Sequence, residues 1–363
     1  MSIQESDVLQ ALAGVTDPNT GQDFVSTKQI KNLQIAGDDL SFDVELGYPA
    51  KSQIPALRQA LVAAARAVPG VGNVSVNVVT KVQAHAVQRG VQLMPGVKNI
   101  VGVASGKGGV GKSTTAVNLA LALAAEGAAV GVLDADIYGP SMPIMLGVSG
   151  KPESLDGKSM EPLQNHGVQV SSIGFLVDPD EAMVWRGPMA TQALEQLLRH
   201  TNWRELDYLI VDLPPGTGDI QLTLSQRVPM TGAVIVTTPQ DIALADARKG
   251  VTMFEKVGVP ILGLVENMAV HVCSNCGHVE HIFGAEGGKR YAEEKGLDYL
   301  GALPLALSIR EQADSGRPTV VADPDGEVAA IYKSIARQVA IKIAAKAKDF
   351  SSRFPSIKIS RDT

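Results

Sequence analysis

The sequence predicts an α/β protein in which a doubly wound, mainly parallel sheet follows a small α+β domain. Three observations support this fold class. From Asn99 onward, short apolar runs alternate with longer helical segments. Apolar residues make up 45% of the 363 residues and aromatic residues only 4%, so the core is expected to consist mostly of Ala, Val, Leu and Ile. A glycine-rich motif also lies between the first apolar run and the helix that follows it.

Residues 1–80 are expected to form the small α+β domain. Apolar and polar residues alternate from Leu40 to Leu46, which is the pattern of a strand with one buried face. The spacing of the other apolar residues completes an αββαβ order, with helices over Asp7–Val15 and Gln53–Val68 and strands over Leu33–Ile35, Leu40–Leu46 and Val74–Val79. Residues 81–97 carry no strong period and are interpreted as a linker.

Residues 98–345 are expected to form the larger domain, followed by a tail over residues 346–363. Its apolar runs have the length of strands that are buried on both faces. These runs are Ile100–Ala104, Ala129–Leu133, Tyr208–Val211, Ala233–Thr237, Ile261–Val265 and Leu300–Leu303. Ligands bind such sheets at the carboxyl ends of the strands, so functional residues are expected directly after these runs.

Charge and composition exclude several classes of protein. A net charge of −6 argues against nucleic acid as the main partner. The polar, acidic start at Met1–Asp7 lacks the features of a signal peptide. The apolar stretch Thr114–Leu133 contains Glu126, so it is predicted to be a core helix rather than a membrane span. With only two Cys, three positions apart, a disulfide framework is excluded, and we expect a cytoplasmic protein without a membrane partner.

The glycine-rich motif predicts a phosphate-binding P-loop for ATP. It fits G-x-x-x-x-G-K-[ST] between a predicted strand and a predicted helix, and comprises Gly106, Lys107, Gly108, Gly109, Val110, Gly111, Lys112 and Ser113, with Thr114 next to it. Lys112 is expected to neutralise β- and γ-phosphate charge, and Ser113 to bind Mg²⁺. Because Lys112 is expected to lie in the loop, its replacement by Ala should abolish ATP turnover and leave the fold intact.

Three more candidate residues follow apolar runs. Asp136 is placed to orient the attacking water or to accept its proton. Asp212 suits the coordination shell of Mg²⁺, and the Gly/Pro-rich loop after it suits a switch that senses γ-phosphate. A helix cap or a turn is the structural alternative for each Asp. Asn267 is a candidate for contact with the adenine edge, and a turn role explains it equally well.

The Cys273-Ser274-Asn275-Cys276 segment predicts a metal or redox site. One interpretation is thiolate ligation of an iron–sulfur cluster. A second is zinc held by both Cys with His278 and His281, although four ligands within nine residues would be strained. A redox pair and a surface CxxC without a role are the remaining alternatives. An all-thiolate cluster needs four Cys, so a cluster would require two chains, as a two-fold homodimer supplies.

Together these motifs resemble known families. The loop with its extra Lys107 resembles the deviant Walker A motif of the MinD, ParA and nitrogenase iron-protein group, in which this lysine reaches the phosphates of the partner subunit. Over residues 95–345 the sequence is similar to the Mrp/ApbC family of iron–sulfur carrier ATPases. The motifs that carry this likeness are Gly106–Thr114, Asp134–Ser141, Trp185–Pro188, Asp212–Asp219, Glu266–Met268 and Cys273-x-x-Cys276. The N-terminal region is similar to the small iron–sulfur-assembly domain, on its Asp17–Gly21 turn and αββαβ order.

The resemblance implies an ATPase that uses Lys107, Lys112 and Asp136 in hydrolysis. It implies a homodimer that holds a [4Fe–4S] cluster between paired CxxC motifs, receives it from an assembly scaffold and passes it to apo-proteins. Two other functions stay open: a ParA/MinD-like positioning ATPase and a nucleotide-gated electron donor. For the first, Ile335–Phe350 would be a membrane helix, whereas a solvated amphipathic helix packed on the sheet is the preferred interpretation.

Overall fold

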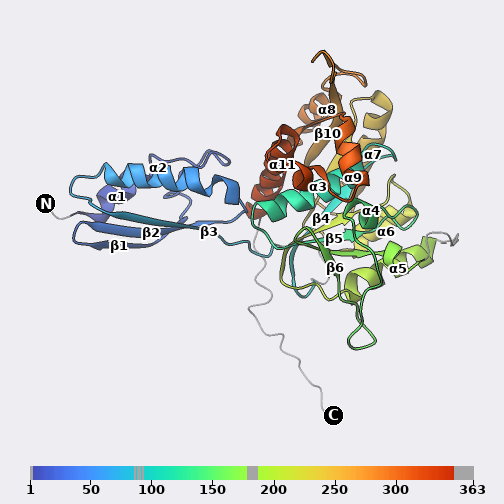
Figure 1. The fold of residues 1–363 in the computed structure, drawn as a ribbon, viewed down its shortest axis with the longest axis horizontal. Coiled ribbons are helices and arrows are strands. Elements are labelled where there is room, and N and C mark those ends of the chain that lie inside the picture. The colour runs from blue at the N-terminus through green and yellow to red at the C-terminus, as the bar shows by residue number, and fades with distance from the viewer. Residues whose placement is uncertain (1–2, 86, 88–90, 92–93, 178–186, 347–363) are drawn as a thin grey trace, which may run out of the picture.

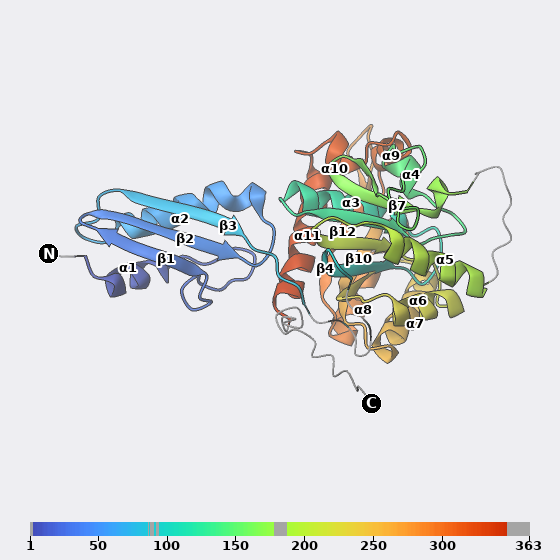
Figure 2. The ribbon, with the colours of Figure 1, turned by 90° about the horizontal axis from the view of Figure 1, so that it is seen from below.

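The computed structural model describes residues 3–85, 87, 91, 94–177 and 187–346. Its N-terminal part is a three-stranded sheet in the order β1-β2-β3, with β1 antiparallel and β3 parallel to β2. Both helices of this part lie on one face of the sheet (Figures 1 and 2). The elements are α1 (Glu5–Leu12), β1 (Ile30–Ala36), β2 (Asp39–Leu46), η1 (Lys51–Gln53), α2 (Ile54–Arg66) and β3 (Val74–Thr80).

The alternation of apolar and polar residues in β2 gives this strand one buried face, as predicted. Leu40, Phe42, Val44 and Leu46 are buried, while the residues between them stay partly exposed. The buried side chains pack with apolar residues of the two helices, including Val8 and Leu61 in full burial. The predicted αββαβ order is therefore present, with element ends that differ by a few residues from those expected.

The larger part is built on a mainly parallel sheet, which among the described residues has nine strands. Their order is β11-β10-β9-β4-β8-β5-β7-β6, with β12 paired to β10. Only β6 and β11 run antiparallel to their neighbours. The strands are β4 (Val97–Ala104), β5 (Val130–Asp134), β6 (Leu163–Asn165), β7 (Val168–Ser172), β8 (Leu206–Asp212), β9 (Gly232–Thr237), β10 (Ile261–Val272), β11 (Val279–Glu280) and β12 (Tyr299–Pro304).

Helices cover both faces of this sheet, as Figure 2 shows. Side chains of each central strand point alternately into two hydrophobic clusters. Val101 and Val103 of β4 pack in the cluster that contains α3 and α11, whereas Ile100 and Ala104 pack in the cluster that contains α5 and α7. The helices are α3 (Lys112–Ala125), α4 (Met142–Met145), η2 (Ile173–Phe175), α5 (Gly187–His200), α6 (Asp219–Arg227), α7 (Asp241–Lys256), α8 (Gly287–Lys295), α9 (Leu307–Asp314), α10 (Thr319–Ala322) and α11 (Glu327–Ala344). The predicted doubly wound fold is confirmed.

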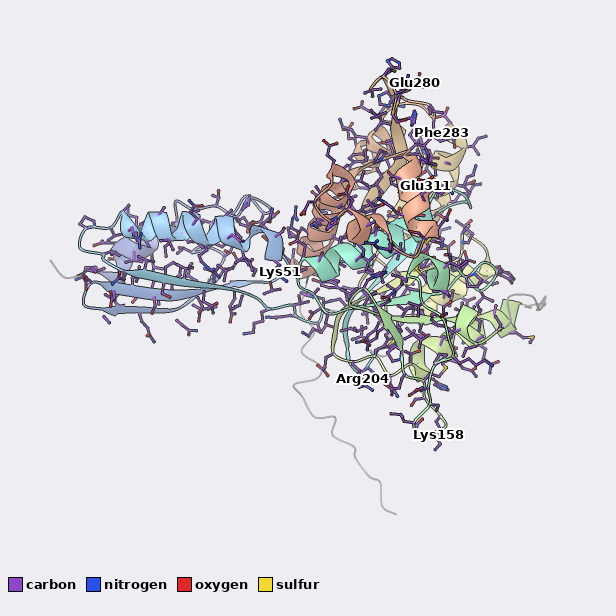
Figure 3. The ribbon with its side chains drawn as sticks, viewed as in Figure 1. Lys51, Lys158, Arg204, Glu280, Phe283 and Glu311 are labelled. Atoms are coloured by element: carbon purple, nitrogen blue, oxygen red, sulfur yellow. The ribbon has the colours of Figure 1, made fainter. Side chains whose placement is uncertain are left out.

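The helix that follows the P-loop ends against the N-terminal part. At its end Glu126 has a fully buried side chain, which accepts hydrogen bonds from Ser52 Oγ at 2.6 Å, from the Ser52 backbone N–H at 2.9 Å and from Arg337 Nη1 at 2.6 Å. Figure 3 shows Lys51 at this junction. Glu126, which argued against a membrane span, thus connects the end of α3 to Ser52 of the N-terminal part and to Arg337 near the C-terminus of the larger part.

The C-terminal helix packs on the sheet rather than standing free. In α11, Ile335, Val339 and Ile343 are buried against the core that also contains α3. The preferred interpretation of this segment, a helix packed on the sheet, is confirmed as far as Ala344, where α11 ends, and residues 347–350 lie outside the described residues. No helix in the described ranges is long and apolar enough to cross a membrane.

Candidate functional site

The P-loop connects the carboxyl end of β4 to the start of α3, where two glycines make room for close approaches. A Cβ on Gly106 would lie 2.2 Å from the carbonyl carbon of Asp246. Gly111 has a φ of +80°, and a Cβ there would lie 2.1 Å from Asn267 Nδ2. Any larger side chain at these positions would displace the backbone. The loop therefore keeps the shape that backbone N–H groups need to surround phosphate.

Lys112 and Ser113 form a buried network with two carboxylates. The ammonium of Lys112 donates to Asp212 Oδ1 at 2.6 Å and lies 3.7 Å from Asp136 Oδ2. Ser113 Oγ donates to Asp212 Oδ2 at 2.6 Å. Both residues expected to bind Mg²⁺ are thus in direct contact, and a hydroxyl with a carboxylate is the oxygen donor set that Mg²⁺ takes in nucleotide sites.

The position of Lys112 revises one expectation. The side chain is 6% exposed and belongs to the first residue of α3, and its partner Asp212 is fully buried. Replacement of Lys112 by Ala would leave a buried carboxylate without its cation, which is costly. The expectation that this change leaves the fold intact therefore does not follow from the structure.

Two carboxyl groups at the end of β5 differ from ordinary surface acids. Burial raises the pKa of Asp136, and the nearby Lys112 ammonium opposes that rise. Asp134 is fully buried and accepts hydrogen bonds from the Ser141 and Met142 N–H groups and from Ser172 Oγ. Burial and the charge of Asp212 raise the pKa of Asp134 to about 7. In the sequence Asp134 stands out only as part of the Asp134–Ser141 motif, and no local pattern indicates that it is a second buried acid.

The remaining nucleotide-site candidates have different surroundings. Asn267 Nδ2 donates to the Val110 carbonyl oxygen of the P-loop at 2.9 Å, so the side chain contacts the loop itself. Lys107 is half-buried and forms no ion pair in the described part of the chain. Next to Asn267, Glu266 accepts from the Gly288 N–H and the Tyr299 hydroxyl, both at 2.8 Å, a buried role that the sequence did not indicate. Trp185 and Arg186 lie outside the described residues.

The cysteines lie on a hairpin that extends from the same edge of the sheet. β10 pairs with β11 through His271↔Glu280 and Val272↔Val279. The turn is closed by the Cys273 N–H, which donates to the His278 carbonyl at 2.9 Å, and by the Gly277 N–H, which donates to the Cys273 carbonyl at 2.8 Å. Glu280 of β11, labelled in Figure 3, marks where this hairpin projects from the sheet.

Both thiols are accessible, and one is activated. Cys276 is exposed and Cys273 half-buried. Hydrogen bonds from the backbone N–H groups of Cys276 and Asn275 lower the pKa of the Cys273 thiol. A lowered pKa increases the thiolate fraction, which is the form that binds metal.

The residues considered as zinc ligands are not assembled into a metal site in the described part of the chain. Within the described residues, no three or more His, Cys, Asp or Glu side chains are grouped so that they could hold a metal ion. His281 Nδ1 lies 2.9 Å from the Ala269 carbonyl oxygen, and His278 lies 3.7 Å from Glu280 on the exposed surface. The described part of one chain therefore has two thiols on the hairpin and no third metal ligand grouped with them.

Comparisons with known proteins find matches for both parts of the chain. A family model described as NUBPL iron-transfer P-loop NTPase matches residues 96–340, and a model of iron–sulfur cluster assembly proteins matches residues 5–78. The iron–sulfur cluster carrier protein of Escherichia coli K12 is 63% identical over 249 residues, which are 68% of each chain. The protein of the same name from Haemophilus influenzae is 47% identical over 341 residues, 94% of this chain and 92% of the relative.

A mouse relative and two solved structures extend the comparison. The mouse iron–sulfur cluster transfer protein NUBPL is 56% identical over 67% of this chain and 77% of its own. A nucleotide-binding protein from Archaeoglobus fulgidus, solved with ADP, is 37% identical with a TM-score of 0.56, over 64% of this chain and 90% of that one. The cell-division ATPase MinD of Pyrococcus furiosus, at 23% identity and a TM-score of 0.51 over 66% of this chain and 98% of its own, shares the fold.

The family predicted from the motifs is thereby confirmed. Because the family model matches more than half of the residues, and the H. influenzae relative aligns along nearly the whole length, this chain belongs to the NUBPL iron-transfer P-loop NTPase family.

Proposed function

We propose that this protein is an ATP-dependent iron–sulfur cluster carrier that works as a cytoplasmic homodimer. Its cargo would be one [4Fe–4S] cluster, held by Cys273 and Cys276 of two chains and passed to apo-proteins. The observation that carries the proposal is the hairpin, which has two accessible thiols at the same end of the sheet as the P-loop and, among the residues that the structure describes, no third ligand grouped with them. Four thiolates complete a cubane cluster, and two such hairpins supply four.

The nucleotide site supports ATP hydrolysis. Lys112 is the cation nearest to where the β- and γ-phosphates lie in a P-loop, and Ser113 with Asp212 would hold Mg²⁺. The bound ion would neutralise phosphate charge. Asp136, whose pKa is raised by burial, lies 3.7 Å from the Lys112 ammonium and is suited to orient the attacking water or to accept its proton.

The dimer would complete both sites. Lys107 forms no ion pair in the described residues, so its charge remains available for the phosphates bound by a second chain. A cation supplied from the partner acts by the same electrostatic principle as an arginine finger. Because the cargo would bind only the paired state, it would stabilise the dimer by mass action. An assembly scaffold would supply the cluster, and apo iron–sulfur proteins would receive it.

Transfer to a reporter enzyme tests the proposal. The protein, loaded with iron and sulfide without oxygen, is mixed with an apo-dehydratase that needs a [4Fe–4S] cluster, in the presence of MgATP. We expect recovery of dehydratase activity, no recovery with Cys276→Ser, and full recovery with Ser274→Ala, a matched change between the two cysteines. If the apo-enzyme recovers no faster than with the same iron and sulfide in buffer, the protein is not a carrier.

A further inference from the structure

A single strand connects the P-loop contact to the cysteine hairpin. β10 runs from Ile261 to Val272, carries Asn267 in its second half and ends directly before Cys273. Six positions therefore separate a side chain that contacts the nucleotide loop from the first thiol. No loop intervenes, so a displacement of the backbone at Asn267 acts directly on the base of the hairpin.

At its P-loop end the strand is tied closely to the loop backbone. Asn267 Nδ2 donates to the Val110 carbonyl at 2.9 Å, and the Gly111 Cα is so near that a Cβ there would lie 2.1 Å from the same nitrogen. Asn267 is 8% exposed, so the contact is packed on its other sides. Close-packed interiors shift as units, so Asn267 is expected to move with the loop.

Between these ends the strand has one strained residue. Met268 has a φ of +55°, in the left-handed region that non-glycine residues rarely occupy. The pairing of β10 with β12 also shifts register between Glu266 and Val270. Strained backbone of this kind persists only where its surroundings enforce it and is common at switch regions. Met268 is thus the point at which β10 can change direction between the loop and the hairpin.

Beyond Met268, two histidines fasten the hairpin to the sheet. His281, just after β11, has Nδ1 2.9 Å from the Ala269 carbonyl, and His271 has Nδ1 3.0 Å from the Leu305 carbonyl. A carbonyl oxygen only accepts, so both Nδ1 atoms carry the hydrogen. The contact of His281 returns to the residue directly after Met268, and it fixes the outgoing arm of the hairpin to the incoming one.

We propose that Asn267 and His281 are positioning residues through which the state of the P-loop sets the placement of Cys273 and Cys276. The inference rests on the proposed function, in which nucleotide acts on the cargo held by those thiols. Asn267 transmits the position of the loop to β10, Met268 is the hinge, and His281 makes the hairpin follow β10. Neither positioning residue is a metal ligand in this arrangement.

The alkylation rate of the two thiols measures the coupling between the P-loop and the hairpin in protein that holds no cluster. The chain has two Cys, so all labelling of reduced, cluster-free protein comes from the hairpin. We expect saturating Mg²⁺ with a non-hydrolysable ATP analogue to change the alkylation rate on the order of fivefold, the lower end of typical site-to-site coupling. With Asn267→Ala at saturating analogue, we expect no change in rate on nucleotide binding.

Two variants of His281 identify how it acts. An Asn side chain can place an N–H near the position of Nδ1, so His281→Asn should keep the nucleotide response, whereas His281→Ala should lose it. Binding of a fluorescent ATP analogue confirms that each variant is saturated. Three outcomes would each overturn the inference. The alkylation rate of the native protein does not respond to nucleotide, Asn267→Ala keeps the full response, or the two His281 variants respond equally. Because no cluster is present, these outcomes are independent of the carrier assay.

Discussion

The P-loop edge buries its charges, whereas the cysteine hairpin exposes its thiols. Lys112 is 6% exposed and Asp212 fully buried, with the two charged groups 2.6 Å apart. In the hairpin Cys276 is exposed, and the apolar side chains around the turn are exposed as well: Val272 by 52%, Val279 by 54% and Ile282 by 53%. Both sites nevertheless lie at carboxyl ends of strands in one parallel sheet, where β9 separates β4, which precedes the P-loop, from β10, which leads into the hairpin.

The difference shows which site one chain can complete. Buried charges must be paired within the fold, because an unpaired buried ion costs several kcal/mol. The nucleotide site meets this condition in one chain. The two exposed thiols of one hairpin cannot complete a four-thiolate site by themselves. Covering the apolar surface around them with a second chain is favourable. The comparison therefore predicts that changes at the buried Lys112–Asp212 pair act within a chain, whereas changes at the hairpin act on the pair of chains.

The largest expected effect is that of Lys112→Ala. ATP turnover should fall on the order of 10³-fold, as for loss of a preorganised electrostatic group. The free energy of unfolding at neutral pH should also fall, by about 3–5 kcal/mol, because Asp212 loses its buried partner. Lys112→Ala with Asp212→Asn should recover part of that stability, and Lys107→Ala is the matched control for stability alone, since Lys107 forms no ion pair in the described residues. Urea unfolding measures the stability of the single and the double variant. If Lys112→Ala is as stable as the native protein, the Lys112–Asp212 pair does not stabilise the fold.

A smaller effect is expected for Asp136→Asn. The amide keeps the shape and loses the proton acceptor, so turnover should decrease by about 10²-fold while the affinity for nucleotide stays nearly native. Single-turnover hydrolysis and binding of a fluorescent analogue separate the two quantities. An equal loss of binding would assign Asp136 to the framework of the site instead.

Mixed dimers test whether the nucleotide site borrows anything from the partner. If Lys107 acts across the dimer, Lys107→Ala mixed with Lys112→Ala should recover up to about half of native turnover in the heterodimer, since one of the two sites is intact there. Each variant alone should be nearly inactive. A verified heterodimer without recovered activity would place Lys107 in its own chain's site.

The buried acid at the end of β5 predicts a pH effect on stability. The pKa of Asp134 is raised to about 7 in the fold, above its unfolded value, so the folded state binds this proton more tightly. Its contribution is fully present below about pH 4 and is lost as the pH rises through about 7. The free energy of unfolding of nucleotide-free protein should therefore decrease over this range, and Asp134→Asn should flatten the decrease.

An exposed acid provides the control for this measurement. Backbone N–H groups of Ser159 and Lys158 lower the pKa of Asp156 to about 2. Its stabilising contribution is lost only as the pH falls toward 2, so Asp156→Asn should leave the slope between pH 4 and 7 unchanged. An identical pH profile for native protein and Asp134→Asn would contradict the assignment of the raised pKa.

The sequence predicted the parts of the fold that local patterns encode. Buried apolar runs identified the central strands, and Asp136 and Asp212 lie at strand ends as predicted. The prediction for Asn267 was wrong in this respect: the strand expected to end at Val265 continues to Val272, so Asn267 lies within β10. The three-residue β6 and the two-residue β11 escaped prediction, because strands at the edge of a sheet are short and show little periodicity. The five-residue β7, which lies between β5 and β6, was also not predicted.

What the sequence did not indicate depends on contacts between distant segments. Asn267 and the Val110 carbonyl are 157 positions apart, and Lys112 and Asp212 are 100 positions apart. The burial of Lys112, and the contact of His281 Nδ1 with the Ala269 carbonyl oxygen, follow from how the strands are arranged. Residue types alone allowed His281 to be a zinc ligand, and only the fold places it against Ala269.

The stoichiometry of the cargo tests the central claim most directly. Protein loaded without oxygen is separated on a sizing column, and iron, acid-labile sulfide, zinc and ATPase activity are measured across the peak. The account predicts about four iron and four sulfide per dimer, co-eluting with the dimer. Cys276→Ser should lose both and keep its ATPase activity. One tightly bound Zn²⁺ per stable monomer, lost in His278→Ala and His281→Ala, would contradict the shared cluster.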